Sequence, residues 1–231
     1  VFQYKFEQRL VFEMQFAKEI SASDLYFLLQ KANEFKNKKI PLEEKKKVKI
    51  EVVKKGFELL VGKSILIEKT KELIFKFANI SEPILVTGET GTGKELVAQA
   101  IHDIGPHSSE PFLAINCGAL TDTLLQSELF GYEVGAFTGA QKEKIGIFEA
   151  AGNGTVFLDE FEDVSPKMQS SLLRVLETNE IRMIGGNYSR KISCKIIIAT
   201  NVVLKNLVTK KTFREDLFFR LVRFEIKLPS L

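Results

Sequence analysis

The chain has 231 residues, and 45% of them are hydrophobic, which is enough for one α/β domain of ordinary size and a smaller piece. The formal net charge is only +3, so composition alone gives no argument for a nucleic-acid groove. No apolar run reaches the length of a membrane span, and no signal-peptide pattern opens the chain. We therefore expect a cytoplasmic protein that has no membrane contact.

The first 56 residues differ from the rest in hydrophobic pattern and lysine content. Hydrophobic residues alternate over residues 2–16, which predicts β structure, and a helix start follows at Ser23. The lysine-rich stretch 36–55 predicts a solvated linker helix, with a DNA-binding basic patch as the alternative. Because the chain begins at Val1 without a methionine, we expect a fragment of a longer protein. Residues 1–56 would then be the end of an upstream sensor or regulatory domain and its linker.

From residue 57 onward, apolar strand patterns alternate with helical ones. Strands are predicted at 84–87, 112–116, 155–158 and 195–200, and helices at 93–103 and 166–177. This order predicts an α/β fold with a parallel sheet flanked by helices over residues 57–231. Cys117 and Cys194 lie in apolar strand patterns, so we expect them to be small core residues of a protein from a reducing compartment.

A glycine-rich loop follows the first predicted strand of this sheet. The spacing Gly88-x4-Gly93-Lys94 is that of a phosphate-binding loop, in which backbone N–H groups and a helix N-terminus converge on phosphate oxygens. Lys94 can then reach the β- and γ-phosphates. Glu95 stands where the general motif has a Ser or Thr that holds magnesium. The predicted nucleotide-binding residues of this loop are Gly88, Glu89, Thr90, Gly91, Thr92, Gly93, Lys94 and Glu95.

A pair of acidic residues ends the third predicted strand. Asp159 is placed to hold Mg²⁺, directly or through water, and Glu160 is placed to orient and deprotonate an attacking water. Taken alone, an Asp-Glu pair can be a solvated strand end, and a glycine loop can be an ordinary turn. Because both motifs occur in order within one α/β pattern, they predict a site for ATP and Mg²⁺.

Between the two motifs lies the hexapeptide Gly-Ala-Phe-Thr-Gly-Ala at residues 135–140. Small residues flank one aromatic ring and one hydroxyl group, which indicates a flexible loop with an apolar tip. The alternative is a turn whose Phe137 packs back into the core. The complete hexapeptide closely resembles the loop that defines the NtrC-like activators of sigma-54 RNA polymerase, which are AAA+ ATPases.

The resemblance to this family extends over residues 60–228. It includes both nucleotide motifs, Asn116-Cys117, Glu-Leu-Phe-Gly at 128–131, Ile-Ala-Thr-Asn at 198–201 and Phe-Arg-Glu-Asp-Leu-Phe-Phe-Arg at 213–220. It implies the P-loop NTPase fold of the AAA+ class. It also explains Glu95, because this family has Glu after the P-loop lysine. The family continues into a helical lid, usually followed by a DNA-binding helix-turn-helix, and we expect neither in this chain.

The resemblance implies roles for three polar residues at strand ends. Asn116 would restrain Glu160 and couple the phosphate state to the loop. Thr200 and Asn201 would form the sensor I motif beside the γ-phosphate, where a hydrogen-bonding side chain can distinguish ATP from ADP.

The resemblance also implies that two arginines act between subunits. Arg214 and Arg220 would be arginine fingers that reach the nucleotide of the neighbouring subunit, a task suited to a planar and permanently charged guanidinium. The alternative is that they form surface ion pairs with Glu215 or Asp216 on the same helix.

Together these features predict a transcription activator that hydrolyses ATP and remodels closed complexes of sigma-54 RNA polymerase. It would work as a hexameric ring and reach promoter or enhancer DNA through a domain outside this chain. Two alternatives are a generic AAA+ remodelling ATPase, which lacks the hexapeptide, and a nucleotide-gated regulator without turnover, which does not need Glu160 or the arginines. The expected sigma-factor contacts are Gly135, Ala136, Phe137, Thr138, Gly139 and Ala140.

Overall fold

The computed structural model describes residue 60 and residues 64–230. The predicted N-terminal β structure, the helix start at Ser23 and the linker helix lie outside the described residues, as does the boundary after residue 56. Within the part that is described, no helix is both long enough and apolar enough to cross a bilayer.

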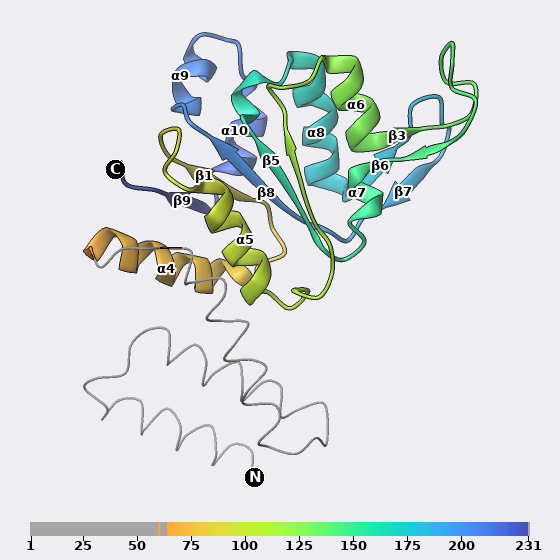
Figure 1. Ribbon diagram of the computed structural model, residues 1–231. Coiled ribbons are helices and arrows are strands. Elements are labelled where there is room, and N and C mark those ends of the chain that lie inside the picture. The colour runs from red at the N-terminus through yellow and green to blue at the C-terminus, as the bar shows by residue number, and fades with distance from the viewer. Residues whose placement is uncertain (1–59, 61–63, 231) are drawn as a thin grey trace, which may run out of the picture. The chain divides into compact units, whose positions relative to one another are not determined.

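Five parallel strands form the central sheet of the described part (Figure 1). They are β1 (Ile84–Thr87), β2 (Phe112–Asn116), β5 (Thr155–Asp159), β8 (Lys195–Thr200) and β9 (Glu225–Lys227). Their order in the sheet is β2-β5-β8-β1-β9, and each neighbouring pair is parallel. The parallel α/β sheet predicted from the sequence is confirmed.

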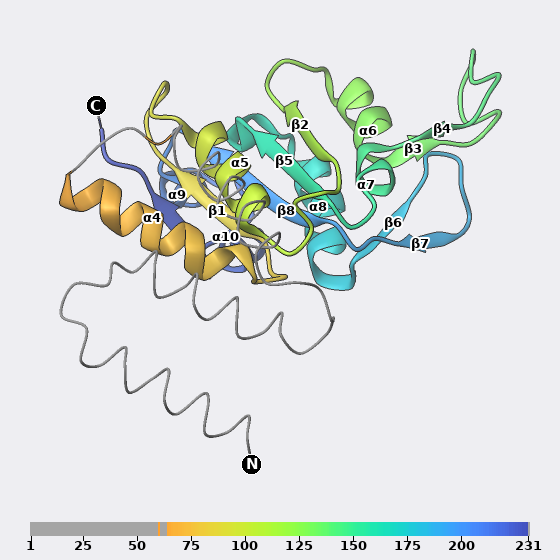
Figure 2. The same cartoon turned by 60° about the horizontal axis from the view of Figure 1, so that its bottom comes forward.

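Helices cover both faces of this sheet. They are α4 (Ile65–Ala78), α5 (Lys94–Ile104), α6 (Asp122–Phe130), α7 (Ile147–Ala150), α8 (Pro166–Thr178), α9 (Leu204–Thr209) and α10 (Glu215–Leu221), with a 3-10 turn η1 (Phe161–Asp163). On one face α4 packs against α5, and on the other α8 packs against α10 (Figures 1 and 2). The predicted helices at 93–103 and 166–177 correspond to α5 and α8.

The three inner strands β1, β5 and β8 are buried along most of their length because both faces of the sheet are covered there. In β8, the side chain of Ile198 belongs to the same core cluster as Leu172 of α8 and Leu217 of α10. The next side chain back along the strand, Ile197, is fully buried outside that cluster, and β8 also contacts α5. Neighbouring residues of a strand point to opposite faces, so each strand is anchored from both sides.

Local signals set the start of α8. The hydroxyl of Ser165 accepts a hydrogen bond from the Met168 N–H at 3.3 Å, and Pro166 occupies the first helical position. Both are typical of a helix N-terminus, since a side chain satisfies one free N–H and proline lacks another. The start of α8 is therefore fixed just after the acidic pair that ends β5.

Two short hairpins lie together beside α6 and α7 (Figure 1). One pairs β3 (Gly131–Tyr132) with β4 (Lys144–Ile145), and the other pairs β6 (Glu180–Arg182) with β7 (Ser189–Lys191). Glu133 N donates to Ile184 O at 3.0 Å, and Ile184 N donates to Gly131 O at 3.0 Å. These backbone bonds join the two hairpins, so the hexapeptide loop between β3 and β4 rests on a small platform of its own.

Lys195, the first residue of β8, holds the C-terminal end of α4. Its Nζ donates to the carbonyl oxygens of Phe77, Ala78 and Ile80 at 2.9, 2.9 and 2.6 Å. An ammonium has three N–H donors, and a cation at a helix C-terminus is also favoured by the helix dipole. Burial lowers the pKa of Lys195 to about 8, so the group is still mostly charged at neutral pH.

Replacing Lys195 by Met should lower the free energy of unfolding by about 2–4 kcal/mol, because three carbonyl groups lose their buried partner. Denaturant unfolding followed by circular dichroism measures the change. Lys191→Met serves as the control, since Lys191 is exposed on β7, and it should change stability by less than about 0.5 kcal/mol. Equal stability of the two variants would show that Lys195 does not anchor α4.

Candidate nucleotide-binding site

A pocket of about 280 Å³ lies at the carboxyl ends of β1, β5 and β8. Three segments contribute to it: the glycine loop with the start of α5, the end of β5, and the residue after β8. The lining residues are Thr90, Gly91, Gly93, Lys94, Glu95, Leu96, Asp159, Glu160 and Asn201. The two motifs that are far apart in the sequence thus meet in one pocket, as parallel strands ending at the same edge require.

The glycine loop wraps around the end of the Lys94 side chain. Lys94 Nζ donates to Gly88 O at 3.0 Å and to Glu89 O at 3.1 Å. Gly93 has φ 86°, a left-handed conformation that costs an L-residue energy, and it is the N-cap of α5. The loop therefore brings a cation and a helix N-terminus to the same place, which is the arrangement that binds phosphate.

The acidic pair after β5 adopts a sharp turn. Glu160 has φ 50° and ψ 47°, a left-handed conformation that is uncommon for a residue with a side chain. Its N–H donates to Asp159 Oδ1 at 2.9 Å. Strained conformations of this kind cost about 1–3 kcal/mol and cluster at functional sites. Both residues of the pair line the pocket.

Asn116 lies beside this turn and supports it indirectly. It is paired with Asp159 in the register of β2 and β5, and its Oδ1 accepts a hydrogen bond from Ala119 N at 3.0 Å. A Cβ atom added to Gly118 would lie 2.8 Å from Glu160 Oε2. The Asn116 side chain stabilises the turn formed by residues 116–119, and the Glu160 carboxylate lies against that turn. A larger residue at position 118 would displace the carboxylate.

The two residues at the end of β8 have different surroundings. Thr200 is fully buried, and its Oγ1 accepts a hydrogen bond from Val202 N at 3.2 Å. Its carbonyl oxygen accepts from Gly88 N at 3.3 Å, which ties the end of β8 to the glycine loop. Asn201 lines the pocket, and its backbone N donates to Glu162 Oε1 at 3.4 Å. Of the predicted sensor pair, only Asn201 borders the pocket directly.

The cysteines are free thiols, and neither is arranged for catalysis. Cys117 is buried at the end of β2, and burial together with the nearby carboxylates of Asp159 and Glu162 raises its pKa to about 12. Burial also raises the pKa of Cys194, to about 11. Both remain protonated at neutral pH, so they lack the thiolate that nucleophilic chemistry requires.

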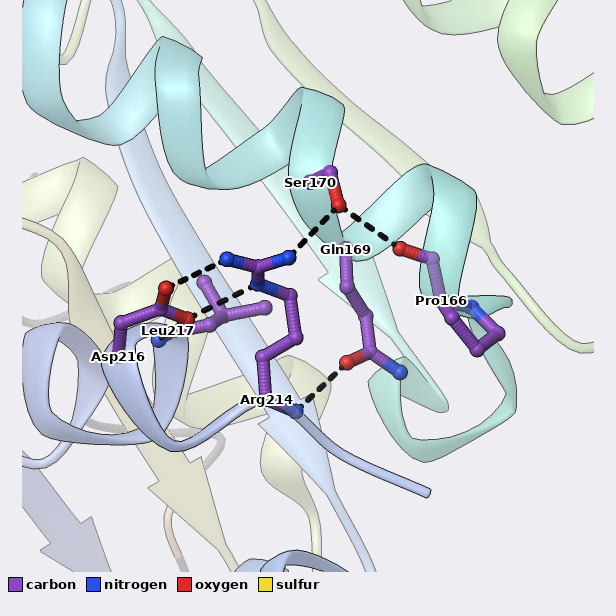
Figure 3. A network of polar contacts seen from close by, with 6 residues as sticks. All are labelled: Pro166, Gln169, Ser170, Arg214, Asp216 and Leu217. Carbon is purple, nitrogen blue, oxygen red and sulfur yellow. Dashed lines mark hydrogen bonds and ion pairs between the residues drawn. The ribbon is translucent and has the colours of Figure 1, made fainter. Parts of the chain in front are cut away.

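Arg214 precedes α10 and is held by side chains of its own subunit (Figure 3). Its Nε and Nη2 donate to Asp216 at 3.0 and 2.6 Å, and its Nη1 donates to Ser170 Oγ at 3.2 Å. These hydrogen bonds raise the pKa of Arg214 and lower that of Asp216. The ion pair given as an alternative from the sequence is therefore present. Arg214 is not among the residues that line the nucleotide pocket, but borders an open hollow of about 500 Å³ with Phe219.

Arg220, in the last turn of α10, also lies away from the nucleotide pocket. Its Nη2 donates to Leu176 O at 2.9 Å and forms an ion pair with Glu82 Oε2 at 3.0 Å. Both predicted fingers are thus engaged within their own chain, and neither borders the pocket of that chain.

The hexapeptide loop forms a compact turn with an exposed ring. Gly135 N donates to Ala140 O at 2.9 Å, and Ala140 N donates to Phe137 O at 3.0 Å. The ring of Phe137 packs edge-on against Tyr132, with centroids 4.9 Å apart, yet the residue is 47% exposed. Phe137 therefore rests on its own hairpin rather than in the core, which contradicts the alternative of a buried turn.

The pocket fits a magnesium ion that is held mainly through the nucleotide. In the described part of the chain, no group of three or more His, Cys, Asp or Glu side chains is arranged to hold a metal by itself. Mg²⁺ commonly takes one or two carboxylates, and phosphate oxygens and waters complete its shell. Of the acidic residues that line the pocket, Asp159 meets this requirement.

Three features of the site were not predicted from the sequence. Leu96 lines the pocket, but in the sequence it resembles any apolar residue of a helix. The approach of Glu160 to Gly118 and the bond from Asn201 to Glu162 depend on tertiary placement. The glycine after Cys117 is the one signal that could have indicated a close approach.

Comparisons with known proteins agree with this geometry. The sequence model of one protein family, the Sigma-54 interaction domain, matches residues 60–227 of this chain. The Nif-specific regulatory protein of Azotobacter vinelandii is 47% identical over 179 residues, which are 77% of this chain and 34% of that protein. The transcriptional regulator VasH of Vibrio cholerae is 46% identical over 172 residues, which are 74% of this chain and 32% of that protein. The chain thus spans about a third of the length of these relatives.

A solved structure gives the same fold over most of the chain. The crystal structure of NtrX from Brucella abortus superposes with a TM-score of 0.69 at 31% identity, covering 93% of this chain and 45% of NtrX. The family model covers more than half of the chain, and the sheet, the glycine loop and the acidic pair all agree with it. The chain belongs to the family of sigma-54-dependent transcription activators, within its AAA+ P-loop NTPase core.

Proposed function

We propose that this chain is the ATP-hydrolysing core of an activator that remodels closed complexes of sigma-54 RNA polymerase. The observation that carries the proposal is the single pocket that joins Lys94, the acidic pair and Asn201, in a chain that also presents an exposed Phe137. NtrX structures with ADP and with ATP are among the similar structures, which supports a nucleotide in this pocket.

The residues of the pocket divide the work of hydrolysis. Lys94 and the N–H groups of the glycine loop bind the phosphates, and Asp159 holds Mg²⁺, which offsets phosphate charge when bound. Glu160 accepts a proton from the attacking water. Asn201 contacts the γ-phosphate, while Thr200 and Asn116 hold the strand ends that carry the reacting groups.

The site is completed by a second subunit. Arg214 and Arg220 do not border the pocket of their own chain, which supports a role at the pocket of a neighbour in a ring, as in a hexamer. Residues 135–140 contact the sigma factor, with Phe137 as the apolar anchor and Thr138 as the polar contact. DNA is bound by a domain outside this chain, and the protein works in the cytoplasm.

Replacing Glu160 by Gln should keep ATP binding and lower turnover by about two or more orders of magnitude, the usual scale for loss of a general base. Phosphate release and nucleotide binding are measured on the same preparation of full-length protein. Glu177→Gln, at an exposed position of α8, is the charge-matched control and should keep normal turnover. Near-normal hydrolysis by the Glu160 variant would remove that residue from the mechanism and favour the regulator without turnover.

Mixing two inactive variants tests whether the site lies between subunits. Lys94→Ala removes the phosphate cradle, and Arg220→Ala removes a finger, so each variant alone should hydrolyse little ATP. A mixture should recover part of the activity, because an intact cradle can then meet an intact finger across an interface. Assembly is confirmed by light scattering, and the absence of recovery at every mixing ratio would indicate a role within one subunit.

Replacing Thr138 by Ala separates the loop from the ATPase. Hydrolysis should stay within a few-fold of normal, because the loop lies on its own hairpins away from the pocket. Sigma-factor binding with a transition-state mimic, and open-complex formation, should both be lost. Thr209→Ala, at an exposed position of α9, should preserve all three. If the Thr138 variant retained sigma-factor binding, the generic remodelling ATPase would be the better reading.

A further inference from the structure

The guanidinium of Arg220 is only partly satisfied where it lies. Its Nη2 donates to Leu176 O at 2.9 Å and pairs with Glu82 Oε2 at 3.0 Å. Its Nε is buried and has no hydrogen-bond partner among the described residues. A guanidinium carries five N–H donors, and a buried donor without an acceptor costs free energy. This position is therefore less favourable for Arg220 than one in which Nε is also paired.

Arg214 differs from Arg220 in this respect. All three of the nitrogens that can donate from its guanidinium are engaged, two with Asp216 and one with Ser170 (Figure 3). Its side chain is also the more exposed of the two, at 45% against 26% for Arg220. Every guanidinium nitrogen of Arg214 has a hydrogen-bond partner, and the side chain lies at the surface. Arg220 is less exposed, and its Nε has no partner among the described residues.

The contact with Glu82 places the Arg220 guanidinium near the amino end of β1. Glu82 lies two residues before β1, so it is near the amino end of that strand. Leu176 is in the last turn of α8, far along that helix from its start beside the acidic pair. The nucleotide pocket, in contrast, lies at the carboxyl ends of the strands. While Arg220 stays with Glu82, it lies away from the nucleotide pocket of its own chain.

We propose that Glu82 is a positioning residue that holds Arg220 within its own subunit and thereby restrains assembly of the composite active site. This inference rests on the proposed function, in which Arg220 reaches the nucleotide of a neighbour. The carboxylate of Glu82 and the phosphate of the neighbour compete for one guanidinium. Phosphate is the better partner, because its oxygens can take two parallel N–H bonds, including one from the unsatisfied Nε.

The competition makes hydrolysis depend on subunit concentration. A half-exposed ion pair of this kind shifts an equilibrium by about 1.5- to 5-fold. Removing it should release Arg220 more often, so fewer subunits should be needed for the composite site to form. The activity of the assembled protein at saturating concentration should change little, because Arg220 has already left Glu82 in that state.

The test is Glu82→Gln in the full-length protein, with ATP hydrolysis measured as a function of subunit concentration. The concentration that gives half-maximal activity should fall by about 1.5- to 5-fold. Glu72→Gln, at an exposed position of α4, removes the same charge from another surface and should leave the midpoint unchanged. Thermal unfolding of both variants checks that each is folded.

Two further variants identify Arg220 as the group through which Glu82 acts. With assembly followed by light scattering against subunit concentration, Glu82→Gln should also lower the midpoint of assembly, and this shift should vanish when it is combined with Arg220→Ala, because Glu82 then has no guanidinium to hold. Glu82→Ala should reproduce the shift, since it also removes the carboxylate. An unchanged or higher midpoint in both Glu82 variants would overturn the inference. If the unaltered protein hydrolysed no ATP at any concentration, the proposed function itself would fail, which is a different result.

Discussion

The site depends on the parallel alignment of β1, β5 and β8. Their carboxyl ends share one edge of the sheet, so the glycine loop, the acidic pair and Asn201 meet although they come from distant parts of the chain. The bond between Gly88 N and Thr200 O fixes the loop to the end of the adjacent strand. Because helices bury both faces of these strands, core packing sets the positions of the functional groups. Hydrogen bonds near the pocket, such as that between Gly88 N and Thr200 O, then adjust the positions that the sheet has set for these residues.

The sequence was sufficient to predict the sheet and the pocket because their signals are local. β1, β2 and β8 are apolar runs bounded by polar residues, and the glycine loop has a fixed spacing. The short helix α9 gave no clear period, since it offers too few residues to show one. The partners of the arginines could not be predicted either. Glu82 and Leu176 become neighbours of Arg220 only after the sheet has formed.

The chain also connects the pocket to the hexapeptide loop through continuous structure. Glu160 leads through η1 into α8, and α8 leads directly into β6. The backbone of Ile184, just after β6, bonds to both Gly131 and Glu133 at the base of the loop. A rigid helix and a pair of backbone hydrogen bonds therefore separate the acidic pair from the loop. Such a route can carry a displacement without any rearrangement of the core in between.

The left-handed turn at Glu160 has a consequence for how this position tolerates change. A glycine there would adopt the same backbone angles without steric strain, while removing the carboxylate altogether. An asparagine would also adopt them more readily than a glutamate, because short polar side chains visit this conformation. The backbone preference at this position and the proposed need for a carboxylate therefore oppose each other at a single residue.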